Sequence, residues 1–219
     1  DVVFSDDTFI AALINSIGIA SIATFISIVL AAMAAYATSR LDFTGKTLIL
    51  SGALAVAMFP PISIVGSLFE MWRSLGIYDT WIGLIIPYMT FTLPLAIYTL
   101  SAFFREIPWE LEQAAQVDGA TPFQAFRKII VPLAAPGVFT AAILAVVNAW
   151  DEFLLARTMM NRVNMRTLSV GITLYQGEFA FPWPLISAAL IIAIVPICIL
   201  IAVFQERVVG GLTSGGVKG

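Results

Sequence analysis

Long apolar runs recur along this chain, and they constrain its fold more than any other feature. Five stretches of roughly 20 residues or more carry no charged side chain, and short polar segments separate them. About 20 consecutive apolar residues suffice to cross the hydrocarbon core of a bilayer as an α-helix. Because that core offers no water to backbone groups, such runs fold as helices. We therefore expect an all-α integral membrane protein with one transmembrane domain over residues 1–219.

Five candidate spans follow from this pattern, and prolines interrupt several of them. The candidates are residues 9–38, 47–69, 80–104, 129–150 and 184–204. The prolines include Pro60 and Pro61 in the second span, Pro87 and Pro94 in the third, and Pro132 and Pro136 in the first turns of the fourth. Neighbouring helices and hydroxyl side chains satisfy the carbonyls that a proline frees, so membranes tolerate such residues. We expect kinks that help packing at these positions.

The composition supports membrane insertion and argues against catalysis by this chain. Hydrophobic residues make up 60% and charged residues 11%, whereas about 25% of residues are charged in soluble domains. The chain has no histidine, and its single cysteine, Cys198, lies in an apolar run. A disulfide within the chain is therefore impossible, a metal site is not expected, and nucleophilic triads lack their usual base. We expect neither an enzyme nor a nucleic-acid partner.

The distribution of lysine and arginine between the loops predicts the orientation in the membrane. With five spans, the loops at residues 40–46 and 105–128 lie on the same side as the tail after residue 205. This side carries seven Lys and Arg residues, and the opposite side carries four. Short loops rich in Lys and Arg stay in the cytoplasm. We therefore expect the central loop and the C-terminus to be cytoplasmic.

The central loop, residues 105–128, has a helical pattern of its own. Pro108 suits a helix start, and no breaker follows until Gly119, which can adopt the left-handed conformation that ends a helix. Thr121, Pro122 and Gln124 then predict a cap, a first helical position and a capping box. The result is a helix–turn–helix elbow. The alternative is an amphipathic helix resting on lipid headgroups, but such helices favour a basic polar face, and this one carries glutamates.

The spacing in this loop resembles a known motif, the EAA loop of ABC importer permeases. That motif runs Glu-Ala-Ala, three residues, Gly, nine residues, Ile, one residue and Leu-Pro, and the matching residues here are Gln113, Ala114, Ala115, Gly119, Ile129 and Pro132. The fuller run at residues 110–120 looks like the carbohydrate-uptake branch, of the MalG type. Other segments that resemble this branch are Asn15-Ser16, Ala35-Tyr36-Ala37, Met58-Phe59-Pro60, residues 148–153 and the tail 211–219. The resemblance covers nearly the whole chain.

Three features depart from the family pattern. Gln113 stands where the family usually has glutamate, which weakens a charged contact to the ATPase or replaces it by a neutral hydrogen bond. Val131 stands for the usual leucine, a small change in packing. The family commonly has six spans, so we expect that one N-terminal span is missing here.

The resemblance implies a transport role in which other subunits carry the chemistry. It implies a type I ABC importer permease fold and a second permease subunit as heterodimer partner. It also implies two cytoplasmic ATPase subunits that bind ATP and Mg, an extracytoplasmic solute-binding protein, and the lipid of the bacterial cytoplasmic (inner) membrane. No cofactor is expected on this chain. The elbow would dock on the ATPase through Glu112, Gln113, Ala114, Ala115, Asp118, Gly119 and Phe123.

Polar residues at membrane depth are costly and are candidates for the translocation path. The candidates are Asn15, Ser16, Tyr88, Tyr98, Asn148, Trp150 and Asp151, with Thr90, Thr92 and Glu152 beside them. Sugars need hydrogen-bonding groups and aromatic faces, which tyrosine and tryptophan supply together. The alternative role of each residue is hydrogen bonding between helices. Asp151 and Glu152 end a span, so we expect them to line its mouth or contact the binding protein.

These features predict a permease subunit that passes a sugar, a disaccharide such as trehalose or maltose, by alternating access coupled to ATPase subunits. The composition rich in alanine and valine, Arg157-Thr158 and Thr213-Ser214 resemble actinobacterial disaccharide systems, mycobacterial trehalose permeases in particular. Two alternatives stay open. One is an ABC permease for an amino acid or a polyamine. The other is an ion-coupled secondary transporter, which would favour a charged residue well inside a span.

Overall fold

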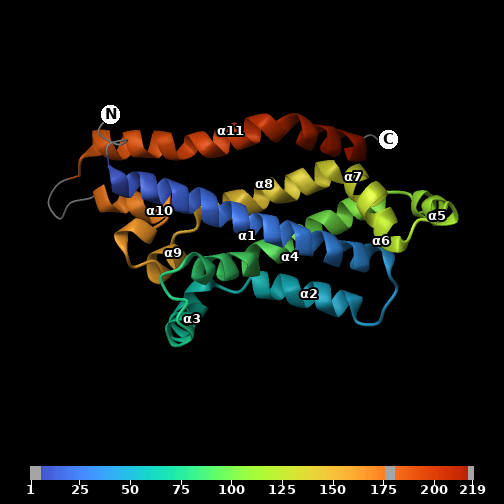
Figure 1. Cartoon of the computed structure of the whole chain (residues 1–219), viewed down its shortest axis with the longest axis horizontal. Helices are drawn as coiled ribbons and strands as arrows, with labels where there is room; N and C mark the ends of the chain where they lie inside the picture. Colours follow the sequence, from blue (N-terminus) through green and yellow to red (C-terminus); the bar gives the residue numbers. More distant parts are fainter. Residues whose placement is uncertain (1–5, 176–180, 217–219) are drawn as a thin grey trace.

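The computed structural model describes residues 6–175 and 181–216, with the backbone alone for residues 205–216. Every regular element in these ranges is helical, which confirms the expected all-α fold. The helices run mostly along one long axis, and the first helix begins at the opposite end from the end of the last one (Figure 1). Residues 217–219 of the predicted tail motif lie outside the described residues.

Three helices are long and apolar enough to cross a membrane. They are α1 (Asp7–Arg40), α4 (Trp81–Glu106) and the segment Trp183–Phe204 of α11 (Trp183–Gly216). Asp6 caps α1, because its side chain accepts a hydrogen bond from Thr8 N. Pro87 and Pro94 lie inside α4 without ending it. These three helices occupy the ranges that the apolar runs predict.

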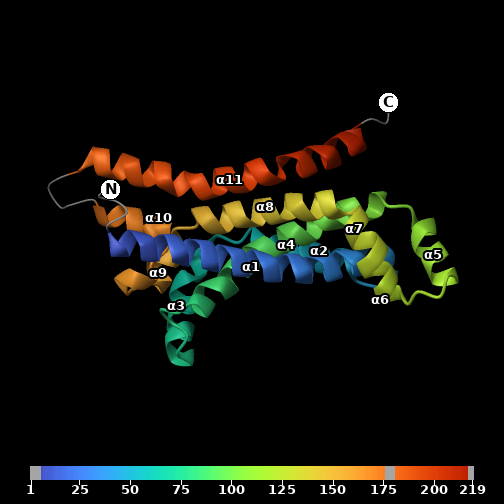
Figure 2. The same ribbon diagram turned by 45° about the horizontal axis from the view of Figure 1, so that its top comes forward.

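The second predicted span is a bent pair of helices. α2 (Lys46–Ala57) and α3 (Pro61–Leu75) meet at 87°. Pro60 has extended backbone angles and Pro61 opens α3, so two successive residues without an N–H prevent α2 from continuing. A kink was expected at these prolines, and the structure shows a sharp bend there, with α3 pointing out of the bundle (Figure 2).

The fourth predicted span is also bent. The short helices α6 (Pro122–Ala125), η1 (Phe126–Ile130) and α7 (Val131–Leu133) lead into α8 (Ala135–Asp151) with a bend of 75°. Pro132 and Pro136 flank this bend at Ala134. By length and composition, the described residues therefore contain three spans, or up to five if each bent pair counts as one.

Short elements close the two ends of the bundle. At the end where α1 begins lie α9 (Leu154–Met159), η2 (Val163–Met165), α10 (Leu168–Gly171) and η3 (Ile172–Tyr175). At the opposite end α5 (Trp109–Val117) stands beyond the bundle, on the side where α11 ends (Figures 1 and 2). The central loop and the end of the last helix thus share one end of the molecule, as the count of spans predicts.

Small residues let α4 and α8 pack closely against α1, which is the central helix. The buried alanines at this contact include Ala31, Ala35, Ala96 and Ala141. Hydroxyl pairs add hydrogen bonds between α1 and α4, with Ser27 Oγ 2.8 Å from Thr92 Oγ1 and Thr38 Oγ1 3.1 Å from Ser101 Oγ. Close backbones and polar bonds of this kind hold helices together in lipid.

Asp79 ties the turn between α3 and α4 to the loop after α9. Its φ of 60° lies in the left-handed region, which Asp and Asn tolerate better than most residues. Its carboxylate accepts a hydrogen bond from Asn161 N at 3.0 Å and forms an ion pair with Arg162 Nε at 2.7 Å. This corner is therefore fixed by charge-assisted hydrogen bonds.

Candidate functional site

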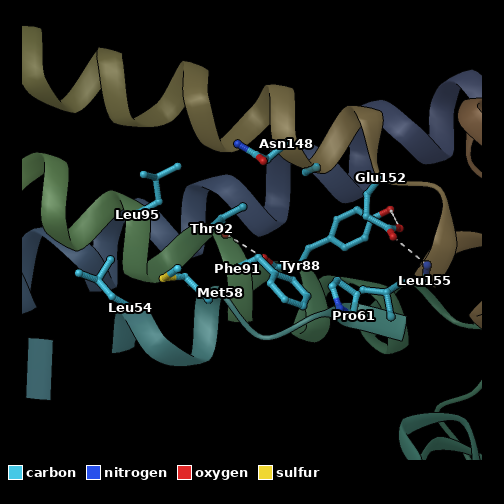
Figure 3. Close-up of a pocket in the computed structure, with 12 residues that line it drawn as sticks. Leu54, Met58, Pro61, Tyr88, Phe91, Thr92, Leu95, Asn148, Glu152 and Leu155 are labelled. Atoms are coloured by element: carbon cyan, nitrogen blue, oxygen red, sulfur yellow. Dashed lines mark hydrogen bonds between the residues drawn. The ribbon is translucent and has the colours of Figure 1, made fainter. Parts of the chain in front are cut away.

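A cavity of about 450 Å³ lies between the α2–α3 bend, α4 and the end of α8. Its wall includes Leu54, Met58 and Pro61 from the bent pair, Tyr88, Phe91, Thr92 and Leu95 from α4, and Asn148, Glu152 and Leu155 from α8 and its continuation (Figure 3). Most of these side chains are apolar. Ligand pockets commonly measure roughly 300–1,000 Å³ and combine an apolar wall with a few placed polar groups.

Tyr88 and Glu152 form the polar end of this cavity (Figure 3). The Tyr88 hydroxyl donates to Glu152 Oε2 over 3.1 Å. The same carboxylate accepts Leu155 N at 2.8 Å and Ala156 N at 3.0 Å. Those amides belong to the first turn of α9, where N–H groups lack partners within the helix. Glu152 therefore caps α9 and holds the tyrosine hydroxyl in place.

Asn148 and Thr92 add polar groups further along the wall. Asn148 is exposed on α8, and its Nδ2 donates to the carbonyl of Leu144 at 2.8 Å. Thr92 is buried, and its Oγ1 donates to the carbonyl of Tyr88 at 3.0 Å. The cavity thus brings together two predicted path residues, Tyr88 and Asn148, with Glu152 and Thr92 beside them.

Asn15 and Ser16 lie elsewhere and hold a loop. Asn15 Nδ2 donates to the carbonyls of Asn164 and Arg166 at 2.9 and 3.1 Å, and its Oδ1 accepts Trp81 Nε1 at 3.0 Å. Ser16 Oγ accepts the first backbone N–H of α10 at 2.7 Å. Both side chains are buried. They were expected on the path, and the structure instead gives them the bonding role that the sequence left as the alternative.

The three other predicted path residues do not reach this cavity. Trp150 and Asp151 line a second cavity, of about 300 Å³, between α8, α10 and α11. Tyr98 is 61% exposed on α4 and lines neither cavity. Helical spacing explains the separation, because Trp150 and Asp151 point about 100° from their neighbours at Ala149 and Glu152.

Sequence reasoning missed the apolar part of the cavity wall. Met58 and Phe91 line it, yet in a sequence an apolar side chain that faces a cavity looks like one that faces lipid. The Pro60-Pro61 step was the available signal. Broken helices at membrane depth are tolerated where they line a cavity or are buried in protein.

The central elbow has the local structure that its sequence predicts. α5 begins after Pro108, Gly119 has a φ of 91°, and Thr121 and Gln124 form the capping box that opens α6. The elbow exposes Gln113, Ala114, Asp118 and Gly119. The most exposed of its large apolar side chains are Val117 at 87% and Phe123 at 64%. Val117 gives no signal of its own in the sequence.

Glu112 faces the opposite way and is fully buried. The hydroxyl of Tyr36 on α1 donates to Glu112 Oε1, and Arg40 Nε lies 3.5 Å from Glu112 Oε2. Arg40 Nη2 also donates to the carbonyl of Ile107 at 2.8 Å, and its guanidinium carbon lies 5.2 Å from the ring centroid of Trp109. Glu112 was expected on the docking face. The structure corrects this expectation, because the Glu112 side chain is buried and bonds to residues of α1. Ala115, also buried, lies on the same inner side.

The sequence matches the family described as binding-protein-dependent transport system inner membrane component over residues 27–213. It is 56% identical to the trehalose transport system permease protein SugB of Mycobacterium tuberculosis, over 99% of this chain and 80% of that protein. It is 52% identical to the sulfoquinovosyl glycerol transport system permease protein SmoH of Agrobacterium fabrum, over 99% of this chain and 76% of that protein. It is 41% identical to the trehalose/maltose permease protein MalG of Thermococcus litoralis, over 99% and 79%.

Solved structures share the fold at low sequence identity. A bacterial ABC transporter involved in the import of the acidic polysaccharide alginate matches with a TM-score of 0.79 and 21% identity, over 94% of this chain and 77% of that one. The MetNI methionine ABC transporter, in inward-facing conformations, matches with a TM-score of 0.65 and 18% identity, over 91% and 96%. The fold is therefore that of an ABC importer permease.

The matches confirm the resemblance drawn from the EAA spacing. They cover nearly the whole chain, and the long apolar helices fit a multi-pass protein of the inner membrane. This chain is a member of the family of binding-protein-dependent transport system inner membrane components, the permease subunits of ABC transporters.

Proposed function

We propose that this chain is the permease subunit of an ATP-driven importer that passes a sugar, a disaccharide such as trehalose or maltose, by alternating access. Support for the sugar comes from relatives named for trehalose, sulfoquinovosyl glycerol and maltose over 99% of this chain. The observation that carries the coupling to ATP is the elbow. It stands outside the bundle (Figure 1), and it exposes the small residues Ala114 and Gly119.

The outer face of the elbow is the docking surface for an ATPase subunit in this proposal. Exposed apolar side chains outside a membrane span indicate a protein contact, and Val117 and Phe123 supply them. Ala114 and Gly119 let the partner backbone approach closely. Gln113 offers a neutral amide where a carboxylate was expected, so the contact is a neutral hydrogen bond. ATP and Mg are bound by the partner ATPase subunits, and this chain contributes movement and no catalytic group.

The cavity beside the α2–α3 bend is our candidate for this subunit's part of the sugar path. Tyr88 and Asn148 offer hydroxyl and amide groups, and Phe91 offers an aromatic face. A second permease subunit would complete the path as a heterodimer partner. The loops at the end that carries α9 and α10 then face the solute-binding protein, and the elbow and the C-terminus face the cytoplasm.

Reconstituted uptake tests this function. The complex of both permease subunits and two ATPase subunits is placed in proteoliposomes with ATP and Mg inside, and the binding protein is added outside with radiolabelled trehalose, maltose, an amino acid or a polyamine. Sugar uptake that requires both ATP and the binding protein supports the proposal. Uptake driven by an ion gradient without ATPase subunits contradicts it, as does transport of the amino acid or polyamine alone.

Two variants test the cavity in the same assay. Tyr88→Phe removes one hydroxyl and Asn148→Ala removes one amide from the wall, so each should reduce apparent affinity or rate by about 10-fold. Tyr98→Phe is the matched control, because this hydroxyl lies outside the cavity. Unchanged affinity and rate in both cavity variants would return Tyr88 and Asn148 to a purely structural role.

A further inference from the structure

We infer that Tyr36, Arg40 and Glu112 form an anchor that makes the elbow and the central helix α1 move as one body during transport. We call these three residues the α1 anchor. The inference rests on the proposed docking of the elbow on an ATPase subunit. It adds residues that lie on the side of the elbow turned away from that partner, and it names the helix that receives the movement.

The α1 anchor supplies a connection that the chain itself does not. The backbone links α5 to α4 before it and to α6 after it, and α1 is 76 residues away from Glu112 at Tyr36. Tyr36 and Arg40 are one helical turn apart and project from the same face of α1. Tyr36 donates to Glu112, and Arg40 reaches both Glu112 and the carbonyl of Ile107. The last turn of α1 therefore contacts the elbow at its start, through Ile107, and at its middle, through Glu112.

Aromatic contacts also join the end of α1 to residues at both sides of α5. Trp109, at the start of α5, lies under the guanidinium group of Arg40. The ring of Tyr36 lies 4.9 Å from the ring of Phe126 in η1, centroid to centroid. Phe126 in turn meets Phe104 at the end of α4, with centroids 6.4 Å apart. The end of α1 therefore contacts Ile107 after α4, Trp109 at the start of α5 and Phe126 in η1.

Burial makes this connection hard to break. The side chains of Arg40 and Glu112 are 6% and 1% exposed. A buried charge whose partner is taken away is strongly unfavourable, so the elbow cannot slide away from α1 without a large penalty. A movement of the exposed face that carries Gln113 is therefore transmitted to α1 through Glu112, the adjacent buried residue on the same helix.

α1 carries that movement to the cavity. Ser27, about two and a half turns before Tyr36, bonds Thr92 at 2.8 Å, and Thr92 forms part of the cavity wall. The contact between α1 and α4 is close along its length because it is lined by alanines. A rigid helix thus joins the elbow at one end to the cavity wall near its middle. The test of this connection is a direct measurement of coupling.

The experiment uses the full complex with its binding protein in proteoliposomes, and trehalose and maltose are the probes. The variants are Glu112→Gln and Arg40→Lys, and Glu106→Gln, which removes the same charge at an exposed position near the end of α4, is the control. Three quantities are measured: ATPase subunits retained on purification, ATP hydrolysis with and without loaded binding protein, and sugar molecules taken up per ATP.

We expect the anchor variants to retain the ATPase subunits and to lose sugar uptake per ATP by about 10-fold. A merely structural role would lower the yield of assembled complex and leave uptake per ATP unchanged. Glu106→Gln should stay within about two-fold of the wild type, because an exposed charge contributes little. Gln113→Ala, on the outer face, should instead weaken retention of the ATPase. Unchanged uptake per ATP in both anchor variants overturns the inference, and so does loss of the ATPase subunits from a folded Glu112→Gln permease.

A second pair of variants covers the case in which Glu112→Gln or Arg40→Lys does not assemble. Tyr36→Phe removes one hydroxyl. It is tested alone and, where Glu112→Gln assembles, in combination with that variant, whereas its losses should simply add to those of the control Glu106→Gln. Residues of one network lose less together than the sum of the single losses, so Tyr36→Phe alone should lower uptake per ATP and add little to Glu112→Gln. A normal Tyr36→Phe complex, or losses that add fully to those of Glu112→Gln, overturns the anchor. Absence of uptake by the wild-type complex contradicts the proposed function itself, and normal uptake by wild type and variants alike contradicts the anchor alone.

Discussion

Buried polar side chains tie together segments that are far apart in this sequence. Asn15 on α1 holds the carbonyls of Asn164 and Arg166, and Asp79 holds Arg162 across the end of the bundle. A polar group in apolar surroundings is costly unless it is bonded, so each of these ties fixes one arrangement. Single residues thus decide which loops meet, and polarity alone does not mark a transport path.

Asp6 and Tyr175 form a similar long-range hydrogen bond outside the membrane-spanning segments. The Tyr175 hydroxyl donates to Asp6 Oδ2 at 2.8 Å, and Thr8 Oγ1 donates to Asp6 Oδ1 at 2.5 Å. Hydrogen bonds from Thr8 and then from Tyr175 hold the pKa of the Asp6 carboxyl below its ordinary value. Burial, followed by the bond to Asp6, raises the pKa of Tyr175 to about 12.

We predict that Tyr175→Phe lowers the unfolding temperature by an amount that depends on pH. The lowered Asp6 pKa contributes stability that is lost as pH falls below about 4, and the raised Tyr175 pKa contributes stability that is lost as pH rises from about 10 towards 12. The difference from wild type, measured by thermal unfolding in detergent, should be constant between about pH 5 and 9 and should shrink on both sides.

Thr173→Val is the control for this measurement. It removes a hydroxyl that bonds only the nearby carbonyl of Val170, so its effect should not vary with pH. A Tyr175→Phe difference that is equally independent of pH would contradict the assigned role of the Asp6–Tyr175 bond.

At the scale of elements, helix ends were predictable because the residues that set them act locally. Gly119 and the Thr121–Gln124 capping box end and restart a helix wherever they occur, and the apolar runs give the span limits. The 87° bend was not predictable. Pro60-Pro61 fixes where α2 stops, but the direction of α3 depends on packing with other segments.

The candidate site was predictable to the same limited extent. Tyr88 and Asn148 stand out as polar residues in apolar runs, but their meeting depends on how α4 and α8 pack. Met58 belongs to a segment that resembles the sugar branch, but only the nearby proline step marks it as a cavity position. Glu112 is buried because it bonds to Tyr36, which lies 76 residues away, so the sequence of the elbow alone does not predict its orientation.

We predict that Gly119→Val abolishes uptake and leaves membrane insertion intact. A Cβ at Gly119 meets no atom within 4 Å, so the penalty is conformational and amounts to about 1–2 kcal/mol at a φ of 91°. The turn would open and displace α5 from α6. Uptake and ATP hydrolysis in proteoliposomes measure the effect. Gly119→Asn should keep more activity, because asparagine tolerates the left-handed backbone region. Normal uptake by Gly119→Val would contradict the docking role of the turn.

At the scale of the whole molecule, the proposed contact surfaces lie at the two ends of one bundle. The elbow and the end of α11 lie at one end, and the loops from α9 to η3 lie at the other (Figure 1). α1 runs the full distance between them, from Asp7 to Arg40. This arrangement fits an ATPase at one end and a binding protein at the other, with the cavity along the side of the bundle.

We predict that the elbow is reached by reagents only from the cytoplasm. In a Cys198→Ser background, Val117→Cys and Val163→Cys place one thiol at each end, at positions that are 87% and 44% exposed. A membrane-impermeant maleimide added to intact cells that express the permease without its ATPase should label only Val163→Cys. Val117→Cys should react after the cells are opened. Labelling of Val117→Cys in intact cells would reverse the orientation.

The opposite exposure of Glu112 and Gln113 separates two properties that a permease must satisfy at once. In the proposed docking, outward positions such as Gln113 and Val117 meet the ATPase, and the inward Glu112 joins the elbow to α1. Exchanging only the outward positions would therefore change the surface offered to an ATPase and leave the bonds inside the subunit unchanged. One turn of helix thus keeps the proposed contact to a partner and the internal contact to α1 on separate residues.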